Sequence, residues 1–378
     1  MLAGSPDPQL AAPIGTLAPL AHTPNRMKRA IGILTSGGDA PGMNAAIRAT
    51  FRSAKMRDPG MEIVFFRDGF RGLAGRLDSS TDRNVDRSSV RDIIHRGGTF
   101  IGAGRVPQLK LPAADAPDFA TRKQAQEAFL KVAAVNLYQL GIHDLVVIGG
   151  DGSYRGAQTI GAYFRTMFPD RPFRSIGLPG TIDNDIWGSD LSIGFDTALN
   201  NIVDAIRKIR DTVDSHQRGI ILEVMGNTSG WLALQSAIAG GASVVAIPEA
   251  PETWDHDRIL TRLRAGVRNQ YRYFIIVVAE GVLKRAGADW SQRLVERIEH
   301  DPEIHDTDGL PMEVRINSVG HIARGGRPSA LDNIVASKLG AAAAELAQTG
   351  SLGGQAYEGD VAIGTEGDHV VVHPLDLV

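Results

Sequence analysis

The feature that most constrains the fold of this chain is a unit that repeats along it. Each unit is a short run of aliphatic and β-branched residues, then a glycine-rich turn, then a segment with helical spacing of apolar residues. The run 145–148, for example, leads into Gly-Gly-Asp-Gly-Ser at 149–153. Strands that alternate with helices form parallel sheets with helices on both faces. The sequence therefore predicts an α/β protein.

The pattern predicts two Rossmann-like lobes with largely parallel sheets, and an active site in the cleft between them. We expect strands at 31–34, 62–66, 145–148, 175–178, 220–224, 243–247 and 274–278. We expect helices at 44–55, 122–140, 197–214, 231–239, 257–270 and 333–348. The sequence changes character near 191–195, and we expect the chain to cross between lobes again near Arg324. The first lobe is predicted to hold 28–193 and 323–360, and the second lobe 194–322 and 361–378.

Composition excludes several classes of function. The chain has no cysteine, which excludes disulfides, thiolate metal sites and a cysteine nucleophile, and which suits a reducing cytoplasm. A formal net charge of −3 argues against broad attraction to nucleic acid, and apolar runs such as 274–279 are too short to cross a bilayer. We therefore expect a cytoplasmic protein with neither nucleic acid nor membrane as partner.

The N-terminal segment differs in composition from the rest of the chain. Residues 1–27 are rich in alanine and proline and almost uncharged, so we expect a disordered tail there. Met27 stands directly before the first expected strand, and a translation start at Met27 is a hypothesis that N-terminal sequencing of the native protein would test.

The first turn with chemical meaning is Thr-Ser-Gly-Gly-Asp-Ala-Pro-Gly-Met-Asn at 35–44, which follows an expected strand and opens a helix. Glycines let backbone N–H groups approach a phosphate, and a helix N-terminus adds partial positive charge. The motif is not a P-loop, because the Gly-x-x-x-x-Gly-Lys-Ser/Thr pattern is missing. Taken alone, the turn is equally compatible with an ordinary strand-to-helix connection.

The second turn, 149–153, carries Asp151 between two glycines at the end of a strongly apolar run. A carboxylate in this position suits Mg²⁺, which prefers oxygen ligands and keeps part of its hydration. The alternative is a tight Asp-Gly turn that only reverses the chain. The position between a buried strand and a helix favours a phosphate and metal site.

The third turn is Pro-Gly-Thr-Ile-Asp-Asn-Asp at 179–185, which places two carboxylates two residues apart. Phosphoryl transfer to a hydroxyl needs a base near that hydroxyl and a cation on the donor oxygens. Two close carboxylates also repel each other, which raises a pKa unless a cation offsets the charge. We assign Asp183 as the base and Asp185 to the metal; the alternative is a loop with solvated acids.

Arginines are the candidates for holding an acceptor phosphate, because a planar guanidinium grips two oxygens. Arg218 precedes an expected strand, Arg315 precedes another, and Arg324 belongs to a basic glycine turn at 321–327. Each of them, taken singly, is more often a solvated surface charge. Arg48 and Arg52 lie four residues apart, a spacing that by itself suits a solvated helix face.

Together these motifs resemble the bacterial-type 6-phosphofructokinases. The resemblance runs from about Lys28 to the C-terminus and rests on 33–44, 149–153, 179–185, 215–218, 223–226 and 320–326. It implies a glycolytic kinase that transfers the γ-phosphoryl group of MgATP to the 1-hydroxyl of fructose 6-phosphate. It also implies a homotetramer whose sites are shared between subunits, with a nucleotide-binding first lobe and a sugar-phosphate-binding second lobe.

The resemblance implies a role for individual residues. The catalytic set is Asp183, Thr181, Arg105 and Gly38. The nucleotide site comprises Gly38, Arg105, Val106, Gly150, Asp151, Gly152 and Ser153, with Asp151 and Asp185 on Mg²⁺. The sugar-phosphate site comprises Thr181, Ile182, Asp183, Met225, Gly226, Asn227, Glu280, His321 and Arg324, joined by Arg218 and Arg315 from a neighbouring subunit.

The sequence departs from the family pattern at several positions. Asn227 stands where many relatives carry arginine or another larger residue, and Val106 replaces an aromatic residue. An effector site is half kept, with matches at Arg48, Arg52, Arg87, Arg210 and Glu249. Asn269 and Tyr271 occupy the stretch where the bacterial enzymes place lysines. Loss of two cations weakens a polyanion site, so we predict altered or absent activation by ADP.

The phosphoryl donor is predicted from two glycines, Gly152 and Gly180. The resemblance to the family implies that pyrophosphate-dependent relatives carry Asp in place of Gly152 and Lys in place of Gly180. These larger side chains would fill the space of the nucleotide's α-phosphate. Two glycines leave that space open and favour ATP, with a pyrophosphate-dependent phosphofructokinase as the alternative. A non-catalytic sensor is a further alternative, less favoured because Asp151, Asp183 and Asp185 are all present.

Overall fold

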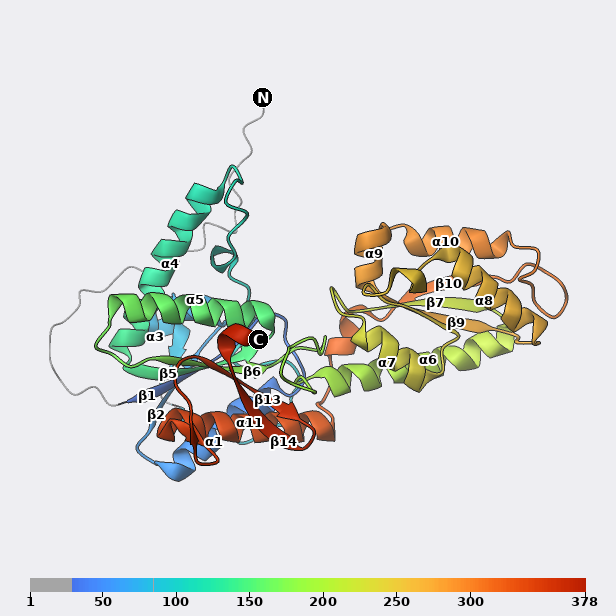
Figure 1. Cartoon of the computed structure of the whole chain (residues 1–378). Helices are drawn as coiled ribbons and strands as arrows, with labels where there is room; N and C mark the ends of the chain where they lie inside the picture. The colour runs from blue at the N-terminus through green and yellow to red at the C-terminus, as the bar shows by residue number, and fades with distance from the viewer. Residues whose placement is uncertain (1–28, 84) are drawn as a thin grey trace. The chain divides into compact units, whose positions relative to one another are not determined.

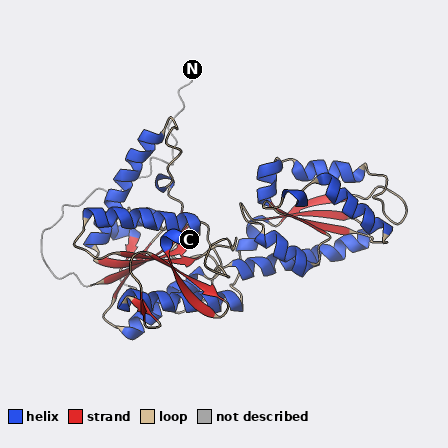
Figure 2. Cartoon of the chain, viewed as in Figure 1, coloured by secondary structure: helices blue, strands red, loops and turns tan. Residues whose placement is uncertain are grey.

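The structure of the protein is a computed structural model that describes residues 29–83 and 85–378. The predicted tail at 1–27 and the start at Met27 lie outside the described residues. The chain forms two compact units. Unit 1 holds the described residues up to Thr181, Ile186–Ile193 and Arg327–Val378, and unit 2 holds Ile182–Asp185 and Gly194–Gly326. Each unit is a sheet with helices on both faces, which confirms the predicted α/β class (Figures 1 and 2).

The sheet of unit 1 has the strand order β14-β13-β6-β5-β1-β2-β3, with β4 paired to β1 off this path. Its strands are β1 (Ala30–Ser36), β2 (Glu62–Phe66), β3 (Thr81–Asp82), β4 (Ala103–Gly104), β5 (Ile142–Gly149), β6 (Arg174–Pro179), β13 (Val361–Glu366) and β14 (His369–Pro374). The central strands β1, β5 and β6 are parallel neighbours, and their side chains are buried on both faces. The short strands β11 (Ser351–Leu352) and β12 (Gln355–Ala356) form a separate antiparallel pair.

Helices cover both faces of this sheet (Figure 1). One face carries α1 (Met43–Arg57) and α11 (Ala330–Thr349), and the other carries α4 (Phe119–Gln139) and α5 (Asp151–Met167). The shorter helices are α2 (Phe70–Leu73), α3 (Leu77–Ser80), η2 (Pro107–Leu109) and η5 (Leu375–Leu377). Gly340 lets α11 pack closely on α1, because a Cβ atom added there would lie 2.5 Å from the Ala46 carbonyl oxygen.

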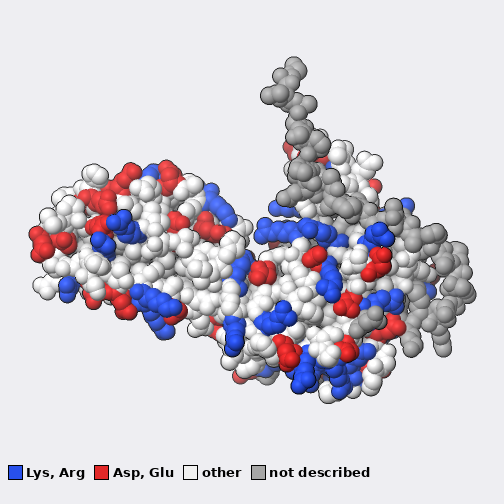
Figure 3. All heavy atoms as spheres, turned by 180° about the vertical axis from the view of Figure 1, so that it is seen from behind, with Lys and Arg blue, Asp and Glu red and all other residues white. Residues whose placement is uncertain are grey.

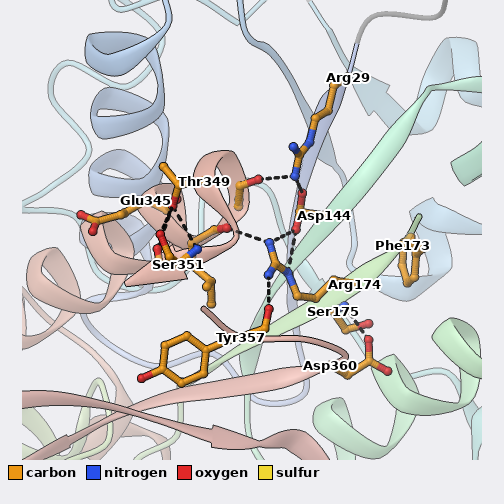
Figure 4. A network of polar contacts seen from close by, with 12 residues as sticks. Arg29, Asp144, Phe173, Arg174, Ser175, Glu345, Thr349, Ser351, Tyr357 and Asp360 are labelled. Atoms are coloured by element: carbon orange, nitrogen blue, oxygen red, sulfur yellow. Dashed lines mark hydrogen bonds and ion pairs between the residues drawn. The ribbon is translucent and has the colours of Figure 1, made fainter. Parts of the chain in front are cut away.

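A buried carboxylate near the amino end of β5 ties several elements of unit 1 together (Figure 4). Asp144 accepts hydrogen bonds from Arg174 at 2.6 Å and from Arg29 at 2.8 Å. The same arginines donate to the carbonyl oxygens of Leu346 and Ala347 in the last turn of α11. The Leu346 carbonyl also accepts from the Gly350 N–H at 2.9 Å, so Arg174 adds a second donor there. The two arginines thus bind a buried carboxylate and the carbonyl end of a helix at once.

Unit 2 has a parallel sheet in the order β10-β7-β9-β8. Its strands are β7 (Gly219–Val224), β8 (Val244–Ala246), β9 (Phe274–Ala279) and β10 (Val314–Ser318). Helices α6 (Phe195–His216) and α7 (Trp231–Gly240) cover one face, while α8 (His256–Arg268), α9 (Glu280–Ala286) and α10 (Trp290–Glu299) cover the other (Figure 1). The short helices are η3 (Pro251–Thr253) and η4 (Gly320–Arg324). The central strand β9 is buried along its whole length.

The units differ from the predicted lobes at two places. Residues 361–378 were expected in the second lobe, whereas β13 pairs in parallel with β6 at Val361 and Ile176 in unit 1. The reason is that β13 is an apolar strand whose first five residues are buried, and it lies between β6 and the antiparallel strand β14. Residues 323–326 belong to unit 2, where the first lobe was expected to resume.

The distribution of charged side chains and the character of the helices agree with what the net charge and the short apolar runs of the sequence indicate. Basic and acidic side chains are interspersed over the visible face of unit 1 (Figure 3), so an anion site on this face must be built locally. Within 29–83 and 85–378, no helix combines the length and the apolar character that a bilayer crossing requires.

Candidate active site

The glycine-rich turns of unit 1 meet at one edge of its sheet. The parallel strands β1, β5 and β6 are adjacent, and their carboxyl ends lead into 37–42, 150–153 and 180–181. Strand β4 pairs with the end of β1 at Ser36 and Gly104, so Arg105 follows beside Gly37. The structure therefore brings Gly38, Arg105 and the 150–153 turn to the same edge, as parallel-sheet geometry predicts.

Tight packing explains why these turns need glycine. A Cβ atom added to Gly149 would lie 2.4 Å from Ser153 Oγ and 2.6 Å from the Ser36 carbonyl oxygen. Gly37 has a φ of +87°, in the left-handed region that favours glycine. Asn44 then fixes the neighbouring loop, since its Oδ1 accepts from the Phe100 N–H at 2.8 Å. The backbone of this edge is held closely enough to present N–H groups to a ligand.

Asp151 is the first residue of α5 and is exposed. Its carboxylate pairs with Arg155 at 2.9 Å, an exposed i, i+4 contact that contributes only ~0.3–0.5 kcal/mol. A cation can therefore replace Arg155 at small cost, and exposed carboxylate oxygens are the ligands that Mg²⁺ prefers. No group of three or more acidic or histidine ligands occurs in the described part of the chain. A magnesium ion held here would complete its shell with phosphate oxygens and water.

The two glycines that bear on the donor differ in their surroundings. A Cβ atom added to Gly152 would have nothing within 4 Å. A Cβ atom added to Gly180 would lie 2.8 Å from Ile148 Cγ2 and 3.0 Å from Met43 Cε. The predicted open space is present beside Gly152. For Gly180 the prediction is wrong, because Ile148 of the sheet and Met43 of α1 already fill the space beside it. Val106, a further predicted nucleotide contact, packs partly buried against the core of unit 1.

Asp183 lies in unit 2, in a short loop with the backbone of Asn184 in the left-handed region at φ 51°. The buried Ser229 donates its Oγ hydrogen to the Asp183 carbonyl oxygen at 2.8 Å, which ties this loop to the one that follows β7. Burial, and next the charge of Asp185, raise the pKa of Asp183 to about 6, while Arg324 acts in the opposite direction. A carboxylate with this pKa is suited to accept a proton near neutral pH.

The predicted sugar-phosphate residues of unit 2 follow the carboxyl ends of its parallel strands. Met225, Gly226 and Asn227 come after β7, Glu280 comes after β9, and His321 and Arg324 belong to η4 after β10. The amide of Gly281 donates to the Gly226 carbonyl at 2.9 Å, which fixes two of these loops to each other. Ile182 differs from the prediction in one respect: its side chain is fully buried, so only its backbone can face a ligand.

Arg218 and Arg315 lie at the opposite end of the same sheet. Arg218 directly precedes β7, and Arg315 is in register with Ile220 at the start of that strand. At about 3.3 Å per residue, Met225 lies roughly 16 Å from Ile220, which pairs with Arg315, and roughly 23 Å from Arg218. Glu313 pairs with both arginines, at 2.6 Å from Arg218 Nε. The structure therefore does not bring these two arginines together with the other sugar-phosphate residues of their own chain.

Comparison with known proteins decides the family. A sequence profile of the family described as Phosphofructokinase matches residues 30–347. The chain belongs to this family. The resemblance inferred from the motifs is thereby confirmed.

Several curated relatives are similar to this chain over most of their length. The ATP-dependent 6-phosphofructokinases of Bacillus licheniformis and Bacillus subtilis are each 42% identical over 350 residues, which cover 92% of this chain and 93% of theirs. That of Macrococcus caseolyticus is 44% identical over 323 residues, 85% of this chain and 87% of its own.

Solved structures show the same fold. Phosphofructokinase from Saccharomyces cerevisiae superimposes with a TM-score of 0.73 at 28% identity over 93% of this chain. The chain spans 45% of the length of that yeast chain. A pyrophosphate-dependent phosphofructokinase from Nitrosospira multiformis also gives a TM-score of 0.73, covering 93% of this chain and 84% of that one. At 20% identity, this second likeness concerns the fold alone.

The predicted effector residues have structural contacts of their own. Arg210 Nη2 donates to the Gly241 carbonyl at 2.8 Å, at the C-terminal end of α7. Glu249 accepts from the Gly230 N–H at 2.7 Å, at the other end of this helix. Burial, and next the charge of Arg52, lower the pKa of Arg48 in α1, and Arg87 is exposed. Asn269 and Tyr271 line a hollow of about 630 Å³ in unit 2. Effector binding by these residues stays a prediction.

Two residues of the site were not found from the sequence. Ser229 supports the loop of Asp183, and no sequence signal distinguishes it from any other serine in a glycine-rich turn. Lys284 lies four residues after Glu280 and pairs with it. The i, i+4 spacing of opposite charges at the start of a helix would have pointed to this pair.

Proposed function

We propose that the chain is a phosphotransferase with an alcohol acceptor that converts fructose 6-phosphate and ATP to fructose 1,6-bisphosphate and ADP, a step of glycolysis. The observation that carries this proposal is Asp183, a carboxylate with a pKa near 6 in the Gly-Thr-Ile-Asp-Asn-Asp loop. The similarity to ATP-dependent 6-phosphofructokinases over 93% of their length supports it. A cytoplasmic location, suited to a chain without cysteine, stays a prediction.

Each part of the site has a role in this reaction. Asp183 accepts the proton of the 1-hydroxyl as that oxygen attacks the γ-phosphorus. His321 and Arg324 bind the sugar phosphate, and the turns after β1 and β5 direct backbone N–H groups at the nucleotide. Arg105 stabilises charge on the transferred group. Asp151 and Asp185 would hold Mg²⁺, which when bound neutralises charge on the donor oxygens.

We further propose that Arg218 and Arg315 bind the sugar phosphate of a neighbouring subunit in a homotetramer. Their place at the amino end of β7, roughly 16–23 Å from the residues after it, supports this division. In a closed symmetric assembly, each subunit that contributes residues to a neighbour's site also receives the same residues from a neighbour. Glu313, which pairs with both arginines, holds them close together for one phosphate group.

The first experiment tests which phosphoryl donor the chain uses. Initial rates are measured with fructose 6-phosphate and either MgATP or pyrophosphate, for the wild type and for Asp183→Asn. We expect turnover with ATP and a loss of ~10²–10⁴-fold in kcat in the variant, the usual range for a general base. Turnover with pyrophosphate and none with ATP would overturn the donor assignment. Near-normal kcat in Asp183→Asn, with folding intact, would overturn the assigned base.

A further inference from the structure

Lys284 in α9 contacts two residues of the proposed sugar-phosphate site. Its Nζ atom donates to Glu280 Oε1 at 3.2 Å and makes a short hydrogen bond to Asn227 Oδ1. The two partners come from different loops, since Asn227 follows β7 and Glu280 follows β9. Lys284 therefore connects the loops at the carboxyl ends of two neighbouring strands.

The backbone fixes the position of Lys284 relative to these partners. The Gly281 N–H donates to the Gly226 carbonyl at 2.9 Å, so the first turn of α9 lies directly on the loop after β7. A Cβ atom added to Gly281 would lie 2.6 Å from the Asn227 carbonyl oxygen, so only glycine allows this approach. The contact between Lys284 and Asn227 thus depends on a close packing of main chains as well as on a flexible side chain.

Charge explains why a lysine matters at this place. The ligand of these loops is an anionic sugar phosphate, whereas Glu280 is an acid and Asn227 is neutral. A cation between them offsets the charge of Glu280 and holds both oxygen acceptors in one arrangement. Lys284 is also close enough to Asp183 for its charge to act on that carboxylate, in the same direction as Arg324. The lysine therefore belongs to the electrostatic surroundings of the reacting groups.

We infer that Lys284 is a positioning residue for sugar-phosphate binding, which orders Glu280 and Asn227 and supplies positive charge to their two loops. This inference rests on the proposed function, because it assigns the ligand of these loops as the acceptor substrate. Lys284 acts through the residues that it holds, and its side chain is 56% exposed, so its replacement leaves the fold intact.

The chain offers a matched control in Lys208. It also pairs with an acid four residues earlier, Asp204, at 2.5 Å, and its side chain is 75% exposed. It lies on α6 in the same unit and has no part in the proposed site. Lys284→Met and Lys208→Met each remove one charge and keep an unbranched side chain that is one atom shorter. Lys284→Arg keeps the charge.

The experiment is steady-state kinetics with fructose 6-phosphate varied at saturating MgATP, and then with MgATP varied. For Lys284→Met we expect the KM for fructose 6-phosphate to rise about tenfold, as loss of one charge-assisted contact predicts. We expect kcat to change by less than about threefold and the KM for ATP to stay constant, because the contact is made in the ground state as well as in the transition state. Lys284→Arg restores most of the affinity, and Lys208→Met behaves as the wild type.

Several results would overturn the inference. One is an unchanged KM for fructose 6-phosphate in Lys284→Met; another is an equal rise in Lys208→Met. A fall in kcat at constant KM, or no rescue by Lys284→Arg, would also contradict a positioning role. If the wild type itself fails to turn over ATP and fructose 6-phosphate, the proposed function falls and this inference falls with it. If the wild type is active and only the lysine series fails, the proposed function stands.

Discussion

Alanine substitutions at Gly152 and Gly180 are expected to have opposite effects on stability. At residue 152 the new methyl group enters open space at the start of α5, with nothing within 4 Å beyond the adjoining backbone of its own helix. At residue 180 it lies 2.8 Å from Ile148 Cγ2 and 3.2 Å from the Gly149 amide nitrogen. We expect Gly152→Ala to leave the free energy of unfolding unchanged or to raise it by up to ~1 kcal/mol, since alanine favours helix. Gly180→Ala is expected to lower it by about 1–3 kcal/mol, the usual cost of overpacking.

Because the space beside Gly152 is open, a negatively charged side chain placed there tests whether ATP is the phosphoryl donor. Gly152→Asp places a carboxylate beside the proposed nucleotide phosphates. Two unit charges about 5 Å apart repel by ~1 kcal/mol in water and by ~3 kcal/mol at an effective dielectric constant of about 20. This corresponds to a loss of roughly fivefold to 200-fold in kcat/KM for MgATP. Gly152→Asn has the same shape without the charge and measures the steric part alone.

Urea unfolding measures the free energy of unfolding of the two alanine variants. Initial rates measure kcat/KM for MgATP in Gly152→Asp and Gly152→Asn. We expect Gly152→Asp to lose more ATP turnover than Gly152→Asn while both variants remain folded. It is refuted if Gly152→Asp retains wild-type kcat/KM for MgATP, or if both variants fall equally. Equal destabilisation by the two alanine substitutions would refute the difference in packing between the two glycines.

Three further predictions concern Asp183 and Arg218. We expect kcat/KM for fructose 6-phosphate to fall below about pH 6, because the base must be ionised; a rate that stays flat down to pH 5 contradicts this. Because the pKa of Asp183 is raised in the folded state, the stability that it contributes is present at low pH and is lost as the pH rises through about 6. Thermal unfolding should therefore show a larger stabilisation by Asp183→Asn at pH 8 than at pH 4. Subunits carrying Asp183→Ala or Arg218→Ala are expected to be inactive separately and to regain activity when co-expressed, since mixed sites then combine an intact Asp183 with an intact Arg218. Mixed assemblies that stay inactive would assign both residues to the site of one chain.

The placement of the site could be predicted because it follows from a rule of parallel sheets. The turns at 37–42 and 150–153 follow parallel strands, and the carboxyl ends of parallel strands lie at one edge of a sheet. That the two strands are neighbours is shown by the structure. The pKa of Asp183 was only partly predictable. Two carboxylates two residues apart predict repulsion, but the larger cause is burial, which depends on packing that no local spacing reveals.

Elements that depend on tertiary packing were harder to predict. Helix α5 begins with Asp-Gly-Ser and contains Gly156 and Gly161, all weak helix formers. Gly156 is needed for packing, because a Cβ atom there would lie 3.0 Å from the Phe70 ring. The strand at 361–366 was not predicted, because its residues do not alternate between apolar and polar and its burial depends on pairing with β6.

The contacts of Asp144 also bear on how the protein forms during synthesis. Arg29 reaches both this carboxylate and the Ala347 carbonyl, and Arg29 and Ala347 are 318 positions apart in the chain. All of unit 2 is synthesised between them. Every residue of unit 2 has been synthesised once residue 326 leaves the ribosome, so this unit can then fold. Unit 1 still lacks α11 at that stage. Residues 327–378 therefore complete unit 1 only after unit 2 has been synthesised, and until then α1 lacks the helix that packs against it.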